Sequence, residues 1–164
     1  MESFQRWEIL RARLPHLPPE RHTAGVNSSA VLLAPAIVLL IAEGLHDLDH
    51  FRQGRLIETP VIALGVLAYV GVIAVVALAF RRRPQAGLWA VVVGFGTALG
   101  FVGVHLLPDW GPFADGYPGL SLDALSWASV GLAIAAAAWL GGAGLAVTML
   151  RHRGPSTPPV SLML

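Results

Sequence analysis

Acidic and histidine side chains crowd the segment between Glu43 and His50, at the end of an apolar stretch long enough to cross a membrane. A helix turns by about 100° per residue. Four of these residues therefore fall on one helical face: Glu43, His46, Asp47 and His50. Asp49 points elsewhere, and we expect it to form an ion pair with a nearby arginine. The face presents imidazole nitrogens and carboxylate oxygens, which bind transition metals or carry protons.

The spacing of the histidines predicts a metal site. His46 and His50 lie four residues apart, so a helix directs both imidazoles at one ion. His105, near the end of another apolar segment, can complete the set from a second helix. The predicted ligands are Glu43, His46, His50, His105 and Asp109. Three nitrogens with one or two oxygens favour zinc, with iron and copper as alternatives.

The run His-Asp-Leu-Asp-His from His46 to His50 is similar to the HExxH pattern of zinc hydrolases in the spacing of its histidines. Asp47 stands where that pattern has the glutamate that acts as a general base. Asp47, or else Glu43, is therefore the candidate catalytic base. An enzyme built on this site would use a metal-activated water or a redox metal on a lipid-soluble or membrane-adjacent substrate. The resemblance covers five residues and assigns no family.

Three other interpretations remain open. Two of the histidines can be axial ligands of a b-type haem held between two helices, in a haem carrier or a non-catalytic subunit of a membrane complex. The ionisable groups can form a proton relay, although the inner parts of the apolar segments lack charged residues and histidines. The charges can also be structural, with the acidic residues paired to Arg52 and Arg55 at a helix end.

Four apolar segments must position these residues. Of the 164 residues, 55% are hydrophobic and 13% are charged, which is too apolar for an ordinary soluble domain. Each segment is close to or longer than the ~20 residues that a helix needs to cross a bilayer. We therefore expect an all-α membrane protein, a bundle of four transmembrane helices at 23–42, 61–80, 84–107 and 124–150.

Arginines predict the orientation, because they precede the first apolar segment and follow the second and fourth. Under the positive-inside rule both termini are cytoplasmic, and we expect a multi-pass protein of the plasma membrane with its site on the outer side. Residues 1–22 form a basic cytoplasmic segment, either an interfacial helix or a disordered tail. Residues 23–150 form the transmembrane domain, and 151–164 a disordered cytoplasmic tail.

Counting along the helices places the polar residues in depth. Glu43 lies as far beyond Arg21 as His105 lies beyond Arg83, so both should reach the same outer level. Two segments also end alike, since an aspartate follows a histidine at both His46 and His105. This likeness hints at a weak two-fold repeat of helix pairs.

Small residues predict close packing of the helices. The glycines concerned are Gly96 and Gly100, which have GxxxG spacing, and Gly141, Gly142 and Gly144. Through these glycine faces we expect a homodimer or a larger membrane complex in the lipid bilayer, and no nucleic-acid partner. At the helix ends, Pro108 should stop the third helix, and Ser121 should cap the fourth with Asp123 in its first turn.

The residue types that are missing exclude several cofactors. The chain has no cysteine, which excludes disulfides, iron-sulfur clusters and thiolate zinc sites. It also has no lysine, which excludes Schiff-base cofactors.

Overall fold

The structure is a computed structural model that describes residues 28–108, 110–118 and 120–152. The described elements, in chain order, are α2 (Ser28–Gln53), α3 (Thr59–Phe80), α4 (Ala86–Phe101), the π-helical segment η1 (Val102–Leu106) and α5 (Ala124–His152). These residues contain no strand, and the expectation of an all-α fold is confirmed. Four helices are long and apolar enough to cross a membrane. The predicted segment 1–22 and most of the predicted tail lie outside the described residues.

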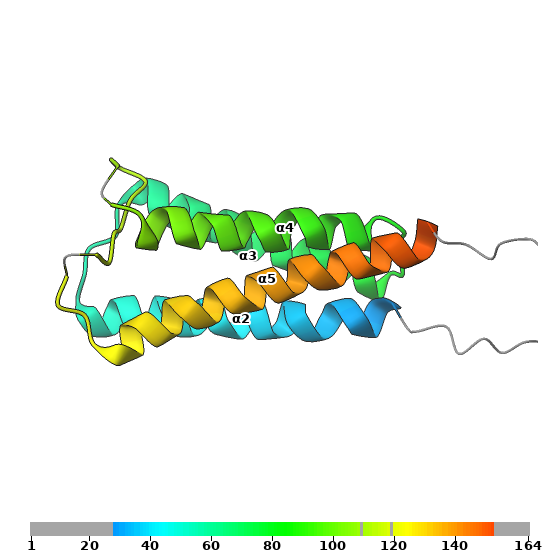
Figure 1. Cartoon of the computed structure of the whole chain (residues 1–164), viewed down its shortest axis with the longest axis horizontal. Coiled ribbons are helices and arrows are strands. Elements are labelled where there is room, and N and C mark those ends of the chain that lie inside the picture. The colour runs from blue at the N-terminus through cyan, green and yellow to red at the C-terminus, as the bar shows by residue number, and fades with distance from the viewer. Residues whose placement is uncertain (1–27, 109, 119, 153–164) are drawn as a thin grey trace, which may run out of the picture.

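Helix α5 crosses the bundle obliquely and makes the most extensive contacts, with α4 on one side and α2 on the other (Figure 1). Helix α3 is the most peripheral, with only three of its residues buried. The first residues of α2 and the last residues of α5 lie at the same end of the bundle (Figure 1). The side of the membrane on which this end lies stays a prediction, and the structure does not support an internal repeat.

Small and medium-sized side chains fill the interior, whereas large apolar side chains cover the outside. Leu39, Val72 and Leu140 are fully buried, and many alanines pack among them. Leu67 and Leu99, by contrast, are 67% and 71% exposed. Lipid tails are as apolar as leucine, so the outer leucines gain nothing by moving inward. Close contact between helix backbones then holds the bundle together.

Glycines let α4 and α5 approach at backbone distance. A Cβ atom added at Gly94 would lie 2.3 Å from the Gly141 nitrogen, and one at Gly144 would lie 2.6 Å from the Gly87 carbonyl oxygen. Backbone atoms cannot move aside as a flexible side chain can, so each position needs a residue without Cβ. The expected packing role is confirmed for Gly141 and Gly144.

Three other glycines make no helix contact among the described residues. A Cβ at Gly96, Gly100 or Gly142 would meet no atom within 4 Å in the described part of the chain. Gly96 and Gly100 lie on the outer face of α4, while Gly94 faces α5. The GxxxG spacing therefore lies on the outer face of α4, and its packing against a second copy of the chain stays a prediction.

The helix ends at the histidine-bearing side of the bundle have defined caps. Gly54 follows α2 with φ of 64°, a left-handed conformation that suits glycine after a helix. Asp123 caps α5, because its Oδ1 accepts a hydrogen bond from the Ser126 N–H at 3.0 Å. This bond, followed by the Arg52 guanidinium, lowers the pKa of Asp123 to about 2. The prediction of Ser121 as the cap is wrong, because α5 begins at Ala124.

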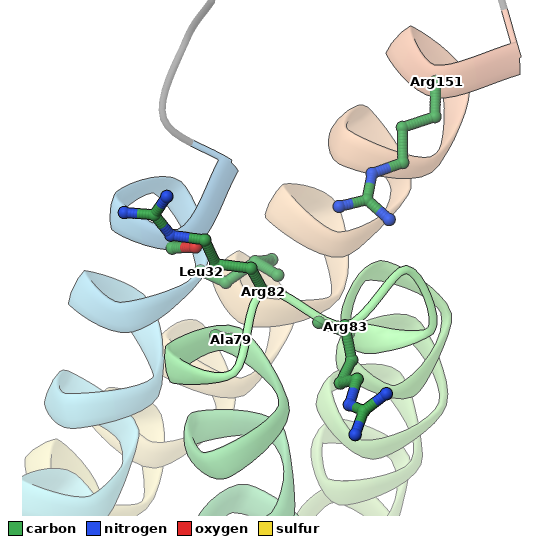
Figure 2. Close-up of a pocket in the computed structure, with 7 residues that line it drawn as sticks. Leu32, Ala79, Arg82, Arg83 and Arg151 are labelled. Carbon is green, nitrogen blue, oxygen red and sulfur yellow. The ribbon is translucent and has the colours of Figure 1, made fainter.

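Arginines gather at the opposite end of the bundle (Figure 2). Arg151 Nη1 donates to the Pro84 carbonyl oxygen at 2.7 Å and joins the end of α5 to the turn between α3 and α4. Arg82 and Arg83 line a cavity of about 10 Å³ beside them. This volume suits a single water molecule, so the cavity indicates no larger ligand.

Candidate metal centre

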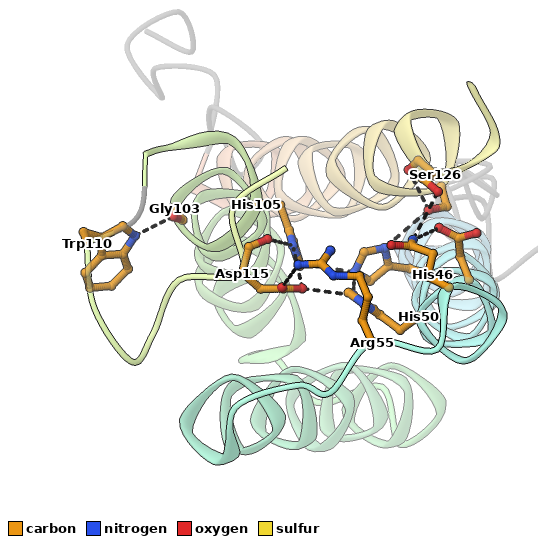
Figure 3. A network of polar contacts seen from close by, with 11 residues as sticks. His46, His50, Arg55, Gly103, His105, Trp110, Asp115 and Ser126 are labelled. Atoms are coloured by element: carbon orange, nitrogen blue, oxygen red, sulfur yellow. Dashed lines mark hydrogen bonds and ion pairs between the residues drawn. The ribbon is translucent and has the colours of Figure 1, made fainter. Parts of the chain in front are cut away.

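Three histidines meet at the end of the bundle opposite Arg82, Arg83 and Arg151. His46 and His50 come from α2, and His105 comes from η1 (Figure 3). His46 Nε2 lies 3.1 Å from His105 Nε2 and 3.0 Å from His50 Nε2. Each of these residues is at most 4% exposed, and one ligand nitrogen from each lies within 4.8 Å of the other two. The structure therefore brings together the histidines that the sequence selected.

His46 and His105 each form a hydrogen bond at the ring nitrogen that points away from the other histidines. These bonds determine which nitrogen carries the proton. The Nδ1 of His105 lies 3.2 Å from the Asp115 backbone oxygen, which can only accept, so this nitrogen carries a proton. Ser129 Oγ donates to the Ser126 carbonyl oxygen, which leaves it to accept from His46 Nδ1 at 3.4 Å. Neutral imidazole carries one N–H, so both Nε2 atoms present lone pairs to the centre.

Aromatic rings surround the imidazoles. The Phe101 ring lies 5.0 Å from that of His46, and the Tyr117 ring lies 5.0 Å from that of His105, measured between centroids. Tyr117 is fully buried, and burial raises the pKa of its hydroxyl. These rings separate the histidines from solvent, so charge at the centre is weakly screened.

The loop after η1 is fixed over the site by the end of that helix. The last carbonyl groups of a helix have no partner within it and must find other donors. The N–H groups of Asp115 and Tyr117 donate to the carbonyl oxygens of Val104 and His105, at 2.9 and 2.8 Å. Trp110 Nε1 donates to the Gly103 carbonyl oxygen at 2.8 Å (Figure 3). The helix end thus holds the loop beside the histidines.

Helix η1 itself ends as predicted. The Leu107 N–H donates to the Val102 carbonyl oxygen five residues earlier, which is the π-helical pattern. Leu107 then turns to an extended conformation with ψ of 155°, as the following Pro108 requires. Segments of π-helix are rare and occur often at functional sites.

Asp115 is a carboxylate beside the histidines that the sequence prediction did not include. One of its oxygens forms an ion pair with Arg55 (Figure 3). The other, Oδ2, lies 3.6 Å from His50 Nε2 and has no hydrogen-bond partner in the part of the chain that the structure describes. The sequence offered only a weak signal, namely an acidic residue in a loop that follows a helix ending in a histidine.

Glu43 lies on the predicted face but apart from the three imidazoles. Its side chain is 3% exposed, and neither carboxylate oxygen has a hydrogen-bond partner among the described residues. Neither oxygen belongs to the group of ligand atoms within 4.8 Å of one another. Asp109, the other predicted carboxylate ligand, lies outside the described residues.

The two aspartates between the histidines lie on different sides of α2. Asp47 is exposed, and its Oδ2 accepts a hydrogen bond from the Tyr69 hydroxyl on α3 at 2.7 Å. Asp49 is 5% exposed and forms the expected ion pair, with Arg52 Nε at 2.7 Å. Two sides of α2 are therefore buried, one that carries the histidines and one that faces α5. The sequence predicted only the first. The role of Asp47 as a base stays a prediction.

Arg52 connects the end of α2 to the start of α5. Its Nη1 lies 2.8 Å from Asp123 Oδ2, and its Nη2 donates to Ser126 Oγ at 3.0 Å. Since Arg52 and Asp123 are both exposed in part, water screens this pair. The structural interpretation of the charges therefore fits Asp49, Arg52 and Asp123, whereas the histidines make no such pairs with Arg52.

Comparison with known proteins gives no relative from which to carry over a function. The chain matches no protein-family model, and neither a curated protein nor a solved structure is detectably similar to it.

Proposed function

We propose that this membrane protein binds a transition metal ion, with zinc preferred, through Nε2 of His46, His50 and His105. The observation that carries the proposal is the convergence of three buried imidazole nitrogens, at 3.0 and 3.1 Å for the two closest pairs. Two of these nitrogens present lone pairs, since Asp115 and Ser129 hold the proton on the opposite nitrogen. Metal-bound histidines commonly have their second nitrogen held in this way.

The distances between the nitrogens suit a single ion. Zinc binds imidazole nitrogen at about 2.0–2.1 Å, so two nitrogens in a tetrahedral site are about 3.3 Å apart. The observed separations are only slightly shorter. Without a proton or a metal ion between them, lone pairs at this distance repel, and repulsion is stronger in a buried site. A bound cation would turn this repulsion into attraction.

The types of ligand favour zinc. Imidazole suits zinc, copper(II) and iron, whereas copper(I) is selected by thiolate and thioether sulfur. The chain has no cysteine, and no methionine among the described residues lies at this end, since Met149 is near the end of α5. Zinc has no geometric preference of its own and accepts a three-nitrogen site with a further oxygen ligand.

A haem between the same histidines is the less favoured alternative. Axial imidazoles bind on opposite faces of the porphyrin, so the ring must fit between them. The His46 ring instead lies edge-on to both others, with centroids 4.6 Å from His50 and 4.7 Å from His105. The helices would have to separate to admit a porphyrin, whereas a single ion fits between the nitrogens as they stand.

Elemental analysis of protein purified without chelator tests the proposal. We expect about one zinc per chain in the wild type, and loss of the metal in His46→Ala and His105→Ala. His152→Ala is the matched control, because His152 is exposed at the opposite end of α5. Its metal content should equal that of the wild type.

A visible spectrum of the same samples separates an ion from haem. A strong Soret band in the wild type that is absent in His46→Ala would overturn the proposal in favour of haem. Equal metal content in the wild type and all three variants would overturn the site itself.

A further inference from the structure

We propose that Asp115 supplies the fourth ligand of the metal, so that the complete site has three nitrogens and one carboxylate oxygen and takes a divalent cation. The inference rests on the proposed function, and it assigns a role to a loop residue that the histidine pattern does not include. It also places one ligand on the loop between η1 and α5, and so connects this loop to the bound ion.

The free oxygen of Asp115 is the first observation. The side chain is 10% exposed, and Oδ2 has no hydrogen-bond partner within the described residues. A buried carboxylate oxygen without a donor is costly, and native proteins seldom keep one without a purpose. It lies 3.6 Å from His50 Nε2, close to the spacing of about 3.3 Å between two ligands of a tetrahedral zinc ion.

The position of the Asp115 backbone is the second observation. Its N–H donates to the Val104 carbonyl oxygen at 2.9 Å, and its carbonyl oxygen holds the Nδ1 proton of His105. The residue is thus anchored to the helix that carries one of the ligands. Among the described residues, the group of ligand atoms within 4.8 Å of one another holds the three imidazoles without the Asp115 carboxylate, so the carboxylate must turn toward them. With the backbone fixed, this movement is a rotation of the side chain.

Charge is the third observation. Three neutral imidazoles leave a divalent ion with its full charge in a buried site, and a carboxylate ligand removes half of it. Arg55 pairs with the other oxygen of Asp115 and is also held by the Tyr117 ring, 5.6 Å from its guanidinium carbon. Arg55 thereby neutralises one oxygen of Asp115 and leaves the other for an ion.

Zinc affinity of the full chain in detergent, measured by competition with a chelating dye, tests the inference. We expect Asp115→Asn to bind zinc at least tenfold more weakly than the wild type. The substitution keeps the size of the side chain and the backbone carbonyl that holds His105. The matched control is Asp123→Asn, whose carboxylate pairs with Arg52 at the other end of the same loop and should leave the zinc affinity unchanged.

Arg55→Gln separates a ligand from a structural role. If Asp115 binds the metal, loss of Arg55 frees its carboxylate, and the zinc affinity should stay the same or rise. If Asp115 matters only through its ion pair with Arg55, both Asp115→Asn and Arg55→Gln should weaken zinc binding equally, and the inference is overturned.

The failures of the two proposals are distinguishable. If Asp115→Asn binds zinc as tightly as the wild type does, Asp115 is not the fourth ligand, and the proposed histidine site is unaffected. A wild-type chain that binds no zinc overturns the proposed function, and the fourth ligand with it.

Discussion

Each imidazole at the centre has one nitrogen directed inward and one directed outward. The outward nitrogens of His46 and His105 find oxygen partners in Ser129 and Asp115, whereas that of His50 has no hydrogen-bond partner among the described residues. The outward bonds therefore prepare two of the three inward nitrogens to accept a cation. We expect His50 to be the most adaptable of the three rings.

Glu43 is a buried carboxylate outside the group of three histidines, and neither of its oxygens has a hydrogen-bond partner among the described residues. A buried carboxylate without donors destabilises the fold unless it has lost its charge or gained a partner. We expect Glu43→Met to raise the free energy of unfolding by about 1–3 kcal/mol and to leave the zinc content unchanged. The change can be measured by denaturant unfolding in detergent micelles.

The matched control is Glu58→Met, since Glu58 is exposed and makes no side-chain cap bond at the start of α3. It should change the free energy of unfolding by less than Glu43→Met. Loss of zinc in Glu43→Met would show instead that Glu43 is a ligand, as the sequence predicted.

At the scale of elements, the candidate metal centre depends on how three helix ends meet. Helix α5 lies between α2 and α4 and contributes Ser129 behind His46, although it carries no histidine at the site. Its close approach to α4 depends on glycines in both helices. Helix α5, which carries none of the three histidines, thus determines how far α2 lies from α4 and η1.

Two glycines of α4, two residues apart, provide a direct test of this arrangement. We expect Gly94→Ala to lower the free energy of unfolding by about 1–3 kcal/mol or more, because its Cβ would meet the Gly141 backbone at 2.3 Å. Gly96→Ala, which meets nothing within 4 Å among the described residues, should raise it by up to about 1 kcal/mol through helix propensity. Thermal or denaturant unfolding of the two variants measures both effects. Equal effects of the two substitutions would contradict the observed packing.

At the scale of the molecule, the bundle separates an arginine-rich end from an end that carries histidines and carboxylates (Figures 2 and 3). The helices between them are long and apolar enough to cross a bilayer. A metal bound at the histidine end would join α2 to η1, and through Asp115 also to the loop. Metal binding should therefore stabilise the whole bundle.

Removal of the metal tests this connection. Treatment with a chelator should lower the unfolding temperature of the wild type, and returning zinc should restore it. Zinc at a hundredfold excess over its dissociation constant stabilises a one-site protein by about 2.7 kcal/mol. His46→Ala should unfold at the same temperature with and without chelator, and a chelator effect of wild-type size in this variant would contradict the prediction.

Sequence and tertiary structure determine different features of this protein: the sequence determines local features, and the tertiary structure determines contacts between distant segments. The sequence by itself determined the four apolar helices, the stop at Pro108 and the pairing of His46 with His50, because hydrophobic length and helical period act within one segment. Depth counting also brought His105 near them, since the helices share one bilayer thickness. The sequence did not single out Gly94, the glycine of α4 that meets Gly141 of α5, because period alone does not say which face meets a neighbour.

The tertiary structure decided what depends on contacts between segments distant in the chain. It brought Asp115 to the histidines through hydrogen bonds between a loop and the end of a helix, a path that no periodic pattern encodes. It turned Asp47 toward α3 and Asp49 toward α5, because the positions of the neighbouring helices define the buried sides of α2. The sequence alone is therefore enough to select the three histidines. The hydrogen bonds and burial that would make them a metal site depend on the fold.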